Sequence, residues 1–388
     1  MNPESVAIAV QLTHFFEQRL SIYVEELAQL CAIECPTSSK QGVDQAADWV
    51  QHWATQRGWE VQRFPDAHVG DGLAITIRHT GHRNILMAAH LDTVYPIGTA
   101  AERPLRIEGD NILGPGTADN KSGLLSALYA MHALEALGLL EGFASLTLMC
   151  GGDEETDMCA SLQLMRRLVP QYEYALVLEA ARENGDIVGA RKGGGTFTLE
   201  AHGRAAHAGV EPEKGAHAIL ALAQQIVDLQ ALNALRPGVT VNVGVIQGGS
   251  VINAVPDYAR ADIDARVKQP EDVELVTQAL QAIAAREYVP GVSTSISGAF
   301  HVGPMAYTPA IAALAQLAQE CAQTLGFRVN IASTGGISYA NHIAMLGVPV
   351  LDGLGPVGGL DHSPREYISK ASIVPRTALL ALLMRRLV

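Results

Sequence analysis

The sequence predicts an α/β protein in which helices cover both faces of a mixed sheet. Segments with strand character and segments with helical spacing alternate up to residue 179 and again after residue 309. Short apolar runs bounded by turn residues indicate buried strands, whereas apolar residues at helical spacing indicate the covering helices. At 388 residues the chain is longer than one hydrophobic core usually requires, so we expect two domains.

The first part of the chain is expected to begin with helices and to continue with alternating elements. Amphipathic spacing predicts helices at 13–33 and 41–56, and short apolar runs predict strands at 59–64, 73–78 and 84–89. The alternation continues with a helix at 122–137, a strand at 144–150, a helix at 158–168 and a strand at 174–178. These elements would form most of one α/β domain.

A block between residues 187 and 297 interrupts this pattern. Its expected elements are strands at 187–201, 239–246, 258–267 and 292–297, with helices at 216–229 and 273–285. The α/β pattern then resumes with helices at 309–325, 337–346 and 373–387 and strands at 328–332 and 348–351. We therefore predict a larger domain in two parts, 1–190 and 303–388, with a smaller inserted α+β domain at 191–302 that would act as a lid.

The composition excludes several classes of protein. A formal net charge of −13 and the absence of a basic stripe argue against a nucleic-acid partner. No apolar run approaches the roughly 18 residues of a membrane span, and Glu4 stands where a secretory signal would carry Lys or Arg. The five cysteines contain no CxxC pair, which favours inert thiols in a reducing compartment. We therefore expect a cytoplasmic protein without membrane contact.

The residues that indicate chemistry follow the ends of predicted strands. The strand at 84–89 leads into His90, and Asp92 comes two residues later. The other candidates at strand exits or in the adjoining loops are Asp119, Glu154, Glu155, Glu179 and His362. Because open α/β sheets bind ligands at the carboxyl ends of their strands, we expect these groups to converge at one edge of the sheet.

Such a set of side chains indicates a centre with two metal ions. Each ion needs several protein ligands, and one carboxylate has to bridge the pair. The neighbours Glu154 and Glu155 cannot point the same way, so one would bind a metal while the other acts as general base on a water. Each motif alone has an ordinary explanation, such as solvated charge for the glutamates or a helix N-cap for Asp119. Their common position favours the metal site.

Six motifs stand in an order and spacing typical of one enzyme family. They are HLDTVYP, GPGTADNKSG, GGDEET, the VLEA that contains Glu179, GRAAHAG and GLDHSP. Over residues 33–387 the sequence resembles the M20 family of di-zinc metallopeptidases, and within it the glutamate carboxypeptidase type, which cleaves C-terminal glutamate from peptides and folate-like compounds. The resemblance implies that the larger domain is catalytic and that the inserted domain serves as lid and dimerisation domain.

The resemblance implies a role for each matching position. The implied ligands are His90, Asp119 and Glu179 for one zinc ion and Asp119, Glu155 and His362 for the second. Asp119 would bridge the ions, Asp92 would orient His90, and Glu154 would be the general base and acid. A cis peptide bond between Asp119 and Asn120 is also implied. Cobalt or manganese would suit the same ligands.

Three positions of the inserted domain also match the family. His207 in GRAAHAG would reach the active site of the partner subunit in a homodimer and stabilise the oxyanion, whereas Asn253 and Arg266 would grip the terminal carboxylate of the substrate. Arginine suits this task because its planar fork holds a carboxylate with two bonds. Two segments depart from the family pattern. STGGISYAN lacks an acidic residue after its glycines, and SISGAF has Ser297 and Gly298 where glutamate-releasing relatives carry a basic residue.

The expected function is metal-dependent hydrolysis of an amide bond, which releases a C-terminal amino acid, with glutamate as the first candidate, from a peptide or an N-acyl conjugate. An N-acyl-amino-acid deacylase of the same family, similar to acetylornithine deacetylase or aminoacylase, would use the same metal set and is the main alternative. A two-metal phosphoesterase is a more distant one, because the motif loops offer few cations beyond Lys121 and Lys192. A metal-binding protein without turnover is disfavoured by the presence of Glu154.

Overall fold

The computed structural model describes residues 3–388, and the chain divides into two compact units. Unit 1 contains the chain up to Gly189 together with Tyr307–Ser333 and Ser338–Val388, and unit 2 contains Ala190–Ala306 and Thr334–Ile337. Within residues 3–388, every helix falls short of the length and apolar character that a bilayer crossing requires.

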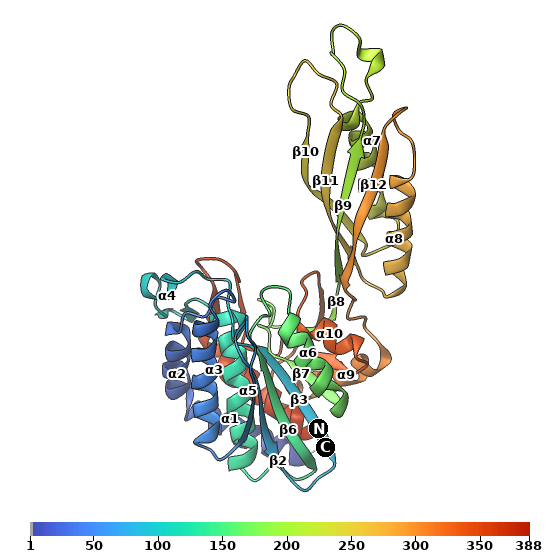
Figure 1. The fold of residues 1–388 in the computed structure, drawn as a ribbon. Helices are drawn as coiled ribbons and strands as arrows, with labels where there is room; N and C mark the ends of the chain where they lie inside the picture. The colour runs from blue at the N-terminus through green and yellow to red at the C-terminus, as the bar shows by residue number, and fades with distance from the viewer. Residues whose placement is uncertain (1–2) are drawn as a thin grey trace. The chain divides into compact units, whose positions relative to one another are not determined.

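A six-stranded mixed sheet forms the centre of unit 1 (Figure 1). Its strands, in spatial order, are β1 (Glu60–Phe64), β2 (Gly72–Arg78), β6 (Phe143–Gly151), β3 (Arg83–His90), β7 (Tyr174–Val177) and β14 (Val350–Leu351). β3 runs parallel to β6 and β7, and β14 runs parallel to β7, whereas β2 is antiparallel to β1 and β6. The carboxyl ends of β3, β6 and β7 therefore meet at one edge of the sheet.

Helices cover both faces of this sheet, as its fully buried central strands require. The helices of unit 1 are α1 (Pro3–Glu17), α2 (Leu20–Ala32), α3 (Lys40–Thr55), α4 (Thr99–Glu102), η1 (Thr117–Lys121), α5 (Ser122–Ala136), α6 (Cys159–Leu168), η2 (Val169–Gln171), α9 (Pro309–Thr324), α10 (Tyr339–Met345) and α11 (Lys370–Arg386). On one face α3 contacts β1 and β2 while α5 contacts β3 and β6; on the other, α6 contacts β2 and β6 while α10 contacts β7 and β14.

A second, smaller sheet of unit 1 holds two loops of the candidate site side by side. Its strands, in spatial order, are β15 (Gly358–Gly359), β16 (Tyr367–Ser369), β5 (Asn111–Leu113) and β4 (Arg106–Glu108), all paired antiparallel. The loop of Asp119 follows β5, and the loop of His362 precedes β16. Because β5 and β16 are neighbours, these two loops leave the small sheet together. The sequence analysis did not predict these short strands.

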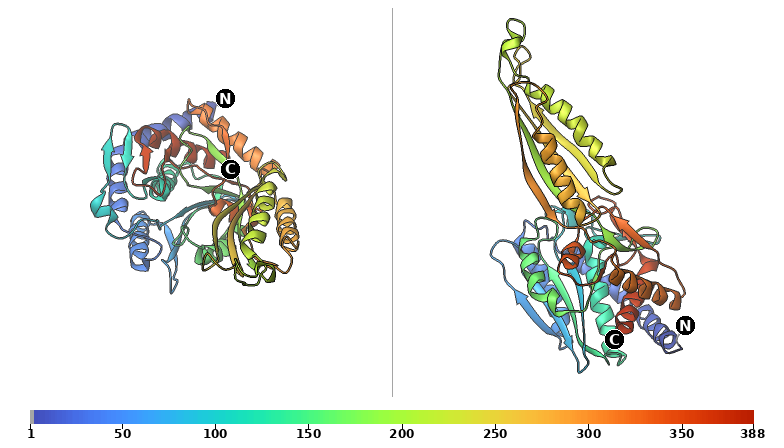
Figure 2. Two further views of the ribbon diagram at one scale, coloured as in Figure 1. Left: turned by 90° about the horizontal axis from the view of Figure 1, so that it is seen from above. Right: turned by 90° about the vertical axis from the view of Figure 1, so that its right-hand side faces the viewer.

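Unit 2 is an antiparallel sheet with two helices packed on one face (Figures 1 and 2). Its strands, in spatial order, are β10 (Thr240–Gly248), β11 (Tyr258–Val267), β9 (Gly193–His202) and β12 (Ser293–Val302), and its helices are η3 (Pro212–Lys214), α7 (Ala218–Ala231), η4 (Leu232–Ala234) and α8 (Glu271–Ala284). Every second residue of β11 is buried and packs with Leu222 of α7 and Leu280 of α8. This alternation is typical of a strand with one covered face. β8 (Ile187–Arg191) pairs with β13 (Ile331–Thr334), and each contains a unit boundary.

The predicted fold class is confirmed, because a mixed sheet with helices on both faces accompanies an inserted α+β block. The single helix predicted at 13–33 is wrong, since α1 ends at Glu17 and α2 begins at Leu20. The Arg19 guanidinium donates a hydrogen bond to the carbonyl of Phe15 at 3.1 Å, which gives one backbone carbonyl near the end of α1 a partner. The guanidinium carbon also lies 3.7 Å from the centre of the Phe15 ring. The segment contains no glycine or proline that would signal this break in the sequence.

Candidate metal centre

Asp119 lies between two groups of candidate metal ligands. Its Oδ1 atom is 2.8 Å from Nε2 of His90, and its Oδ2 atom is 3.1 Å from Nε2 of His362. The carboxylate thus turns one oxygen toward each histidine, which is the arrangement that a ligand shared by two ions requires. The peptide bond between Asp119 and Asn120 is cis, which confirms that expectation.

His90 is fully buried at the end of β3, and its neighbours hold the ring in place. Nδ1 donates a hydrogen bond to the carbonyl oxygen of Asp92 at 3.0 Å and lies 3.4 Å from the Oδ1 atom of the same residue. This contact leaves Nε2 as the ligand atom. Oε1 of Glu179, just beyond β7, lies 4.0 Å from that nitrogen. His90, Asp119 and Glu179 therefore form the first group.

The second group surrounds His362, whose side chain is 54% exposed. Its Nε2 atom lies 3.2 Å from Oε2 of Glu155, in addition to its contact with Asp119. The loop reaches this position through left-handed backbone conformations at Leu360 and His362, with φ of 59° and 60°. Ligand atoms of His90, Asp119 and Glu155 also lie within 4.8 Å of one another, so the two groups are contiguous.

The carboxylate of Asp92 positions the loop that carries the two adjacent glutamates. Its Oδ1 atom accepts a hydrogen bond from the backbone N–H of Glu154, and its Oδ2 atom accepts one from that of Glu155, both at 3.1 Å. The hydroxyl of Thr37 donates to Oδ2 at 2.6 Å. The motif alone suggested only that Asp92 orients His90. Its contact with the glutamate loop depends on the pairing of β3 with β6, which the motif does not reveal.

Three glutamates of the cluster are poorly suited to carry charge without a nearby cation. Burial and the charge of Asp119 raise the pKa of Glu154 to about 8, although His90 opposes the shift. Burial also raises the pKa of Glu155 and brings the pKa of Glu179 well above its usual value. One oxygen each of Glu155 and Glu179 is buried without a hydrogen-bond partner among residues 3–388. Two divalent cations would offset this charge and satisfy both oxygens, so the residues fit a two-metal centre.

The pKa values of Asp119 and the two histidines shift in the directions that favour the charged forms of these groups. Burial would raise the pKa of Asp119, but hydrogen bonds with His362 and His90 hold it far below its usual range. Hydrogen bonds to Asp119 and Glu155 raise the pKa of His362 to about 10. Burial opposes protonation of His90, but hydrogen bonds to Asp119 and Asp92 outweigh it and raise the pKa well above its usual value. A metal ion has to displace these protons, so metal affinity falls on acidification.

Gly123, at the start of α5, allows the end of β7 to approach the bridging loop. A Cβ atom at this position would lie 1.9 Å from the backbone oxygen of Leu178, directly before Glu179. Gly123→Ala should gain about 0.5–1 kcal/mol from helix propensity. It should nevertheless lower the free energy of unfolding by about 1–3 kcal/mol, because the backbone at Leu178 has to move.

Denaturant unfolding and metal content measure this effect. Gly335→Ala is the matched control, because a Cβ there meets nothing within 4 Å. We expect Gly123→Ala alone to unfold earlier and to bind metal more weakly, since Glu179 moves with Leu178. Equal unfolding midpoints for the two variants would contradict the steric role of Gly123.

The candidate substrate residues of the inserted block lie in unit 2. An antiparallel bridge joins His207 to Ala254, so the exposed residues His207 and Asn253 belong to one paired segment. Arg266 is half-buried on β11, and its guanidinium lies 3.0 Å from a carboxylate oxygen of Asp264. A substrate carboxylate would therefore compete with Asp264 for this arginine.

Ser338 of the STGGISYAN segment forms a hydrogen bond with a carboxylate from elsewhere in unit 1, that of Asp352. The hydroxyl of Ser338 donates to Oδ2 of Asp352 at 2.6 Å, and both residues are buried. The charge of Asp352 contributes to the raised pKa of Glu179. A carboxylate that follows β14 thus stands near the first ligand group, although the segment itself carries none.

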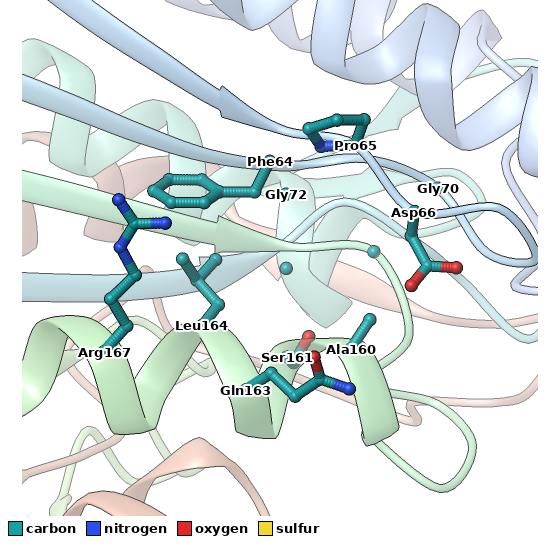
Figure 3. A pocket seen from close by; sticks show the side chains of 12 residues that line it. Phe64, Pro65, Asp66, Gly70, Gly72, Ala160, Ser161, Gln163, Leu164 and Arg167 are labelled. Carbon is teal, nitrogen blue, oxygen red and sulfur yellow. The ribbon is translucent and has the colours of Figure 1, made fainter.

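A cavity of about 350 Å³ lies beside the loop that follows β6 (Figure 3). Gly151 and Gly152 are among the residues that line it. Leu164 and Arg167 extend from α6 toward the ring of Phe64. The Arg167 guanidinium lies 5.1 Å from the centre of that ring. The lining contains none of the candidate metal ligands, so this cavity is separate from the metal centre.

Comparisons with known proteins agree with this fold. Residues 189–292 match the family model of the M20 peptidase dimerisation domain. Carboxypeptidase G2 of Pseudomonas sp. (strain RS-16) is 27% identical over 92% of this chain and 87% of that protein. Acetylornithine deacetylase of Myxococcus xanthus is 29% identical over 53% of this chain and 55% of that protein. The structure of aminopeptidase PepT from Bacillus cereus superposes with a TM-score of 0.81 at 22% identity, covering 94% of this chain and 98% of that one.

The chain is similar to the M20 family of metallopeptidases over almost its whole length and matches that family's dimerisation domain over residues 189–292, which indicates a hydrolase of the peptidase and amidohydrolase class. Within the family it is similar to the glutamate carboxypeptidase type, as the sequence motifs indicated. The family expectation that preceded the structure is confirmed.

Proposed function

We propose that the protein hydrolyses an amide bond and releases a C-terminal amino acid, with glutamate as the first candidate, from a peptide or an N-acyl conjugate. The proposed cofactor is a pair of zinc ions, for which cobalt or manganese could substitute. The observation that carries the proposal is the position of Asp119, whose two oxygens face His90 and His362 separately. We assign His90, Asp119 and Glu179 to one ion, and the second is assigned to Asp119, Glu155 and His362.

The chemistry of the proposed reaction needs a base, an acid and a stabilised oxyanion. When bound, the two cations would lower the pKa of a water and polarise the scissile carbonyl. Glu154 accepts a proton from the water while the water oxygen forms a bond to the carbonyl carbon. The carbon–nitrogen bond then breaks, and Glu154 returns the proton to the leaving amine. Asp92 holds the backbone N–H of Glu154 and thus keeps the base in position.

Residues of unit 2 are proposed to bind the substrate. His207 would reach the active site of the partner subunit in a homodimer and donate a hydrogen bond to the oxyanion of the tetrahedral intermediate there. Asn253 and Arg266 would hold the terminal carboxylate, for which the arginine has to exchange its bond with Asp264. The pairing of the His207 segment with the Asn253 segment supports a joint role for these two residues.

A homodimer through unit 2 is part of the proposal. The match to a peptidase dimerisation domain covers residues 189–292, which form most of this unit. β10 is an edge strand of its sheet, and exposed apolar side chains gather on β10 and α7. They are Leu220, Val227, Val245 and Ile246. An exposed apolar edge strand is a ready surface for pairing with a second chain.

The second candidate is an N-acyl-amino-acid deacylase, which the similarity to acetylornithine deacetylase favours. It would use the same ligands and the same base, so metal content cannot separate the two functions. The SISGAF segment bears on the choice, because Ser297 and Gly298 provide no cation for a glutamate side chain. Only competing substrates separate the candidates.

A release assay on protein reconstituted with zinc tests the proposed function. The substrates are alanyl-glutamate, alanyl-alanine, N-acetylglutamate and N-acetylornithine at equal concentration. We expect alanyl-glutamate to have the highest kcat/KM, a chelator to abolish turnover, and added zinc to restore it. Faster release from the acetylated compounds would favour the deacylase. Turnover that a chelator leaves unchanged would contradict both candidates.

A further inference from the structure

One buried carboxylate outside the two ligand groups contacts the bridging loop directly. Glu366 is 2% exposed, and its side chain accepts three hydrogen bonds from backbone N–H groups. Its Oε1 atom accepts from Ala118 at 2.7 Å and from Asp119 at 2.9 Å, and its Oε2 atom accepts from Gly116 at 2.8 Å. The carboxylate therefore fixes the backbone of the loop from which the Asp119 side chain projects.

The backbone of Glu366 belongs to the loop that carries His362. Its N–H group donates to the carbonyl of Ser363 at 3.2 Å, and the N–H of Ser363 donates to the carbonyl of Leu360 at 3.2 Å. The Leu360–Ser363 turn contains the left-handed conformation of His362, and the Ser363–Glu366 turn follows it directly. A single residue thus holds its own loop through its backbone and the Asp119 loop through its side chain.

A third loop reaches the same place through Tyr95. This residue follows Asp92 in the segment after β3, and its hydroxyl donates to the carbonyl of Ser363 at 3.0 Å. The same phenol interacts with the carboxylate of Glu366. The loops of His90, Asp119 and His362 therefore meet at one carboxylate.

We propose that Glu366 is a positioning residue that sets the separation of Asp119 from His362 and hence the affinity of the second metal site. The role rests on the proposed two-metal centre. Three N–H donors converge on two oxygens, and a carboxylate is the side chain that accepts all of them without presenting a donor. A glutamine keeps the acceptor for Ala118 and Asp119 but turns an N–H₂ group toward the N–H of Gly116.

Cobalt titration of the metal-free protein tests the role without any substrate. Co²⁺ binding is followed by calorimetry and by the visible absorption that depends on ligand geometry. We expect wild type to bind two equivalents. In Glu366→Ala the second equivalent should bind about 10–100-fold more weakly, as when other partners of metal ligands are removed, with a changed absorption spectrum. Glu366→Gln should show a smaller loss, and Tyr95→Phe the smallest.

Glu26→Gln is the matched control for a general loss of stability. Glu26 accepts hydrogen bonds from Trp53 at 3.0 Å and from Tyr129 at 2.7 Å, away from the metal loops. It should lower the unfolding midpoint and leave cobalt binding unchanged. If Glu366→Ala fails to fold, the role of Glu366 is decided by Glu366→Gln and Tyr95→Phe, in which the affinity for the second cobalt equivalent should fall by graded amounts.

Two results would overturn the proposal, and they differ in what else they reject. Wild-type affinity and spectrum in both Glu366→Gln and Tyr95→Phe would reject the role of Glu366 and leave the metal centre intact. A wild-type protein that binds no cobalt would reject the two-metal centre and the role of Glu366 with it.

Discussion

Asp119→Ala is expected to abolish the binding of both metal ions and to reduce hydrolysis to the level of the metal-free protein. Asp119 is the residue that contacts both His90 and His362. Without it, each group keeps two protein ligands, which are too few for a tight site. The loop itself should persist, because Glu366 bonds to the backbone of residue 119 and not to its side chain.

Metal content after dialysis, measured by atomic emission together with kcat, checks this result. Asp92→Asn is the comparison variant, because Asp92 contacts His90 and the glutamate loop but belongs to neither ligand group. We expect it to retain both ions with an affinity lower by about 10–100-fold. An Asp119→Ala protein that retains two ions would show that Asp119 is not the bridge.

Glu154→Gln is expected to lower kcat by about 10²–10⁴-fold while both metal ions remain bound. Glu154 is buried in the cluster but lies in neither ligand group, so its carboxylate is the one left to accept a proton from a water. Glutamine preserves the size of the side chain and the backbone bond to Asp92. KM should change little, because Glu154 acts in the proton-transfer steps and not in the binding of the substrate.

Glu173→Gln provides the control for this substitution. Its carboxylate accepts a hydrogen bond from the backbone N–H of Asn84 at 2.8 Å, at the opposite end of β3 from His90. We expect a kcat equal to that of wild type. The assignment of the base fails if Glu154→Gln retains wild-type turnover, or if it loses its metal ions.

The placement of the candidate ligands could be predicted from the sequence because it follows from strand order and polarity. Apolar runs located β3, β6 and β7, and parallel strands place His90, Glu155 and Glu179 at the same edge. The family resemblance then divided the ligands into two groups. The contacts of Asp119 with His90 and His362 in the structure agree with that division.

Other parts of the site depend on contacts that a linear pattern does not encode. Glu366 accepts bonds from Ala118 and Asp119, which lie nearly 250 positions earlier in the chain. The sequence does not show that Gly123 has to be glycine, because the requirement comes from the backbone of Leu178, which packs against it in the folded chain. The strands of the small sheet have two or three residues each, too few for a periodic signal.

The stoichiometry of zinc binding tests whether Asp119 joins two metal ions. Metal-free wild-type protein is titrated with Zn²⁺ in a calorimeter at neutral pH, where the release of protons from the histidines contributes to the heat. We expect two equivalents per chain for wild type and none of comparable affinity for Asp119→Ala. One equivalent for wild type, or two for Asp119→Ala, would contradict a centre in which Asp119 joins two metal ions.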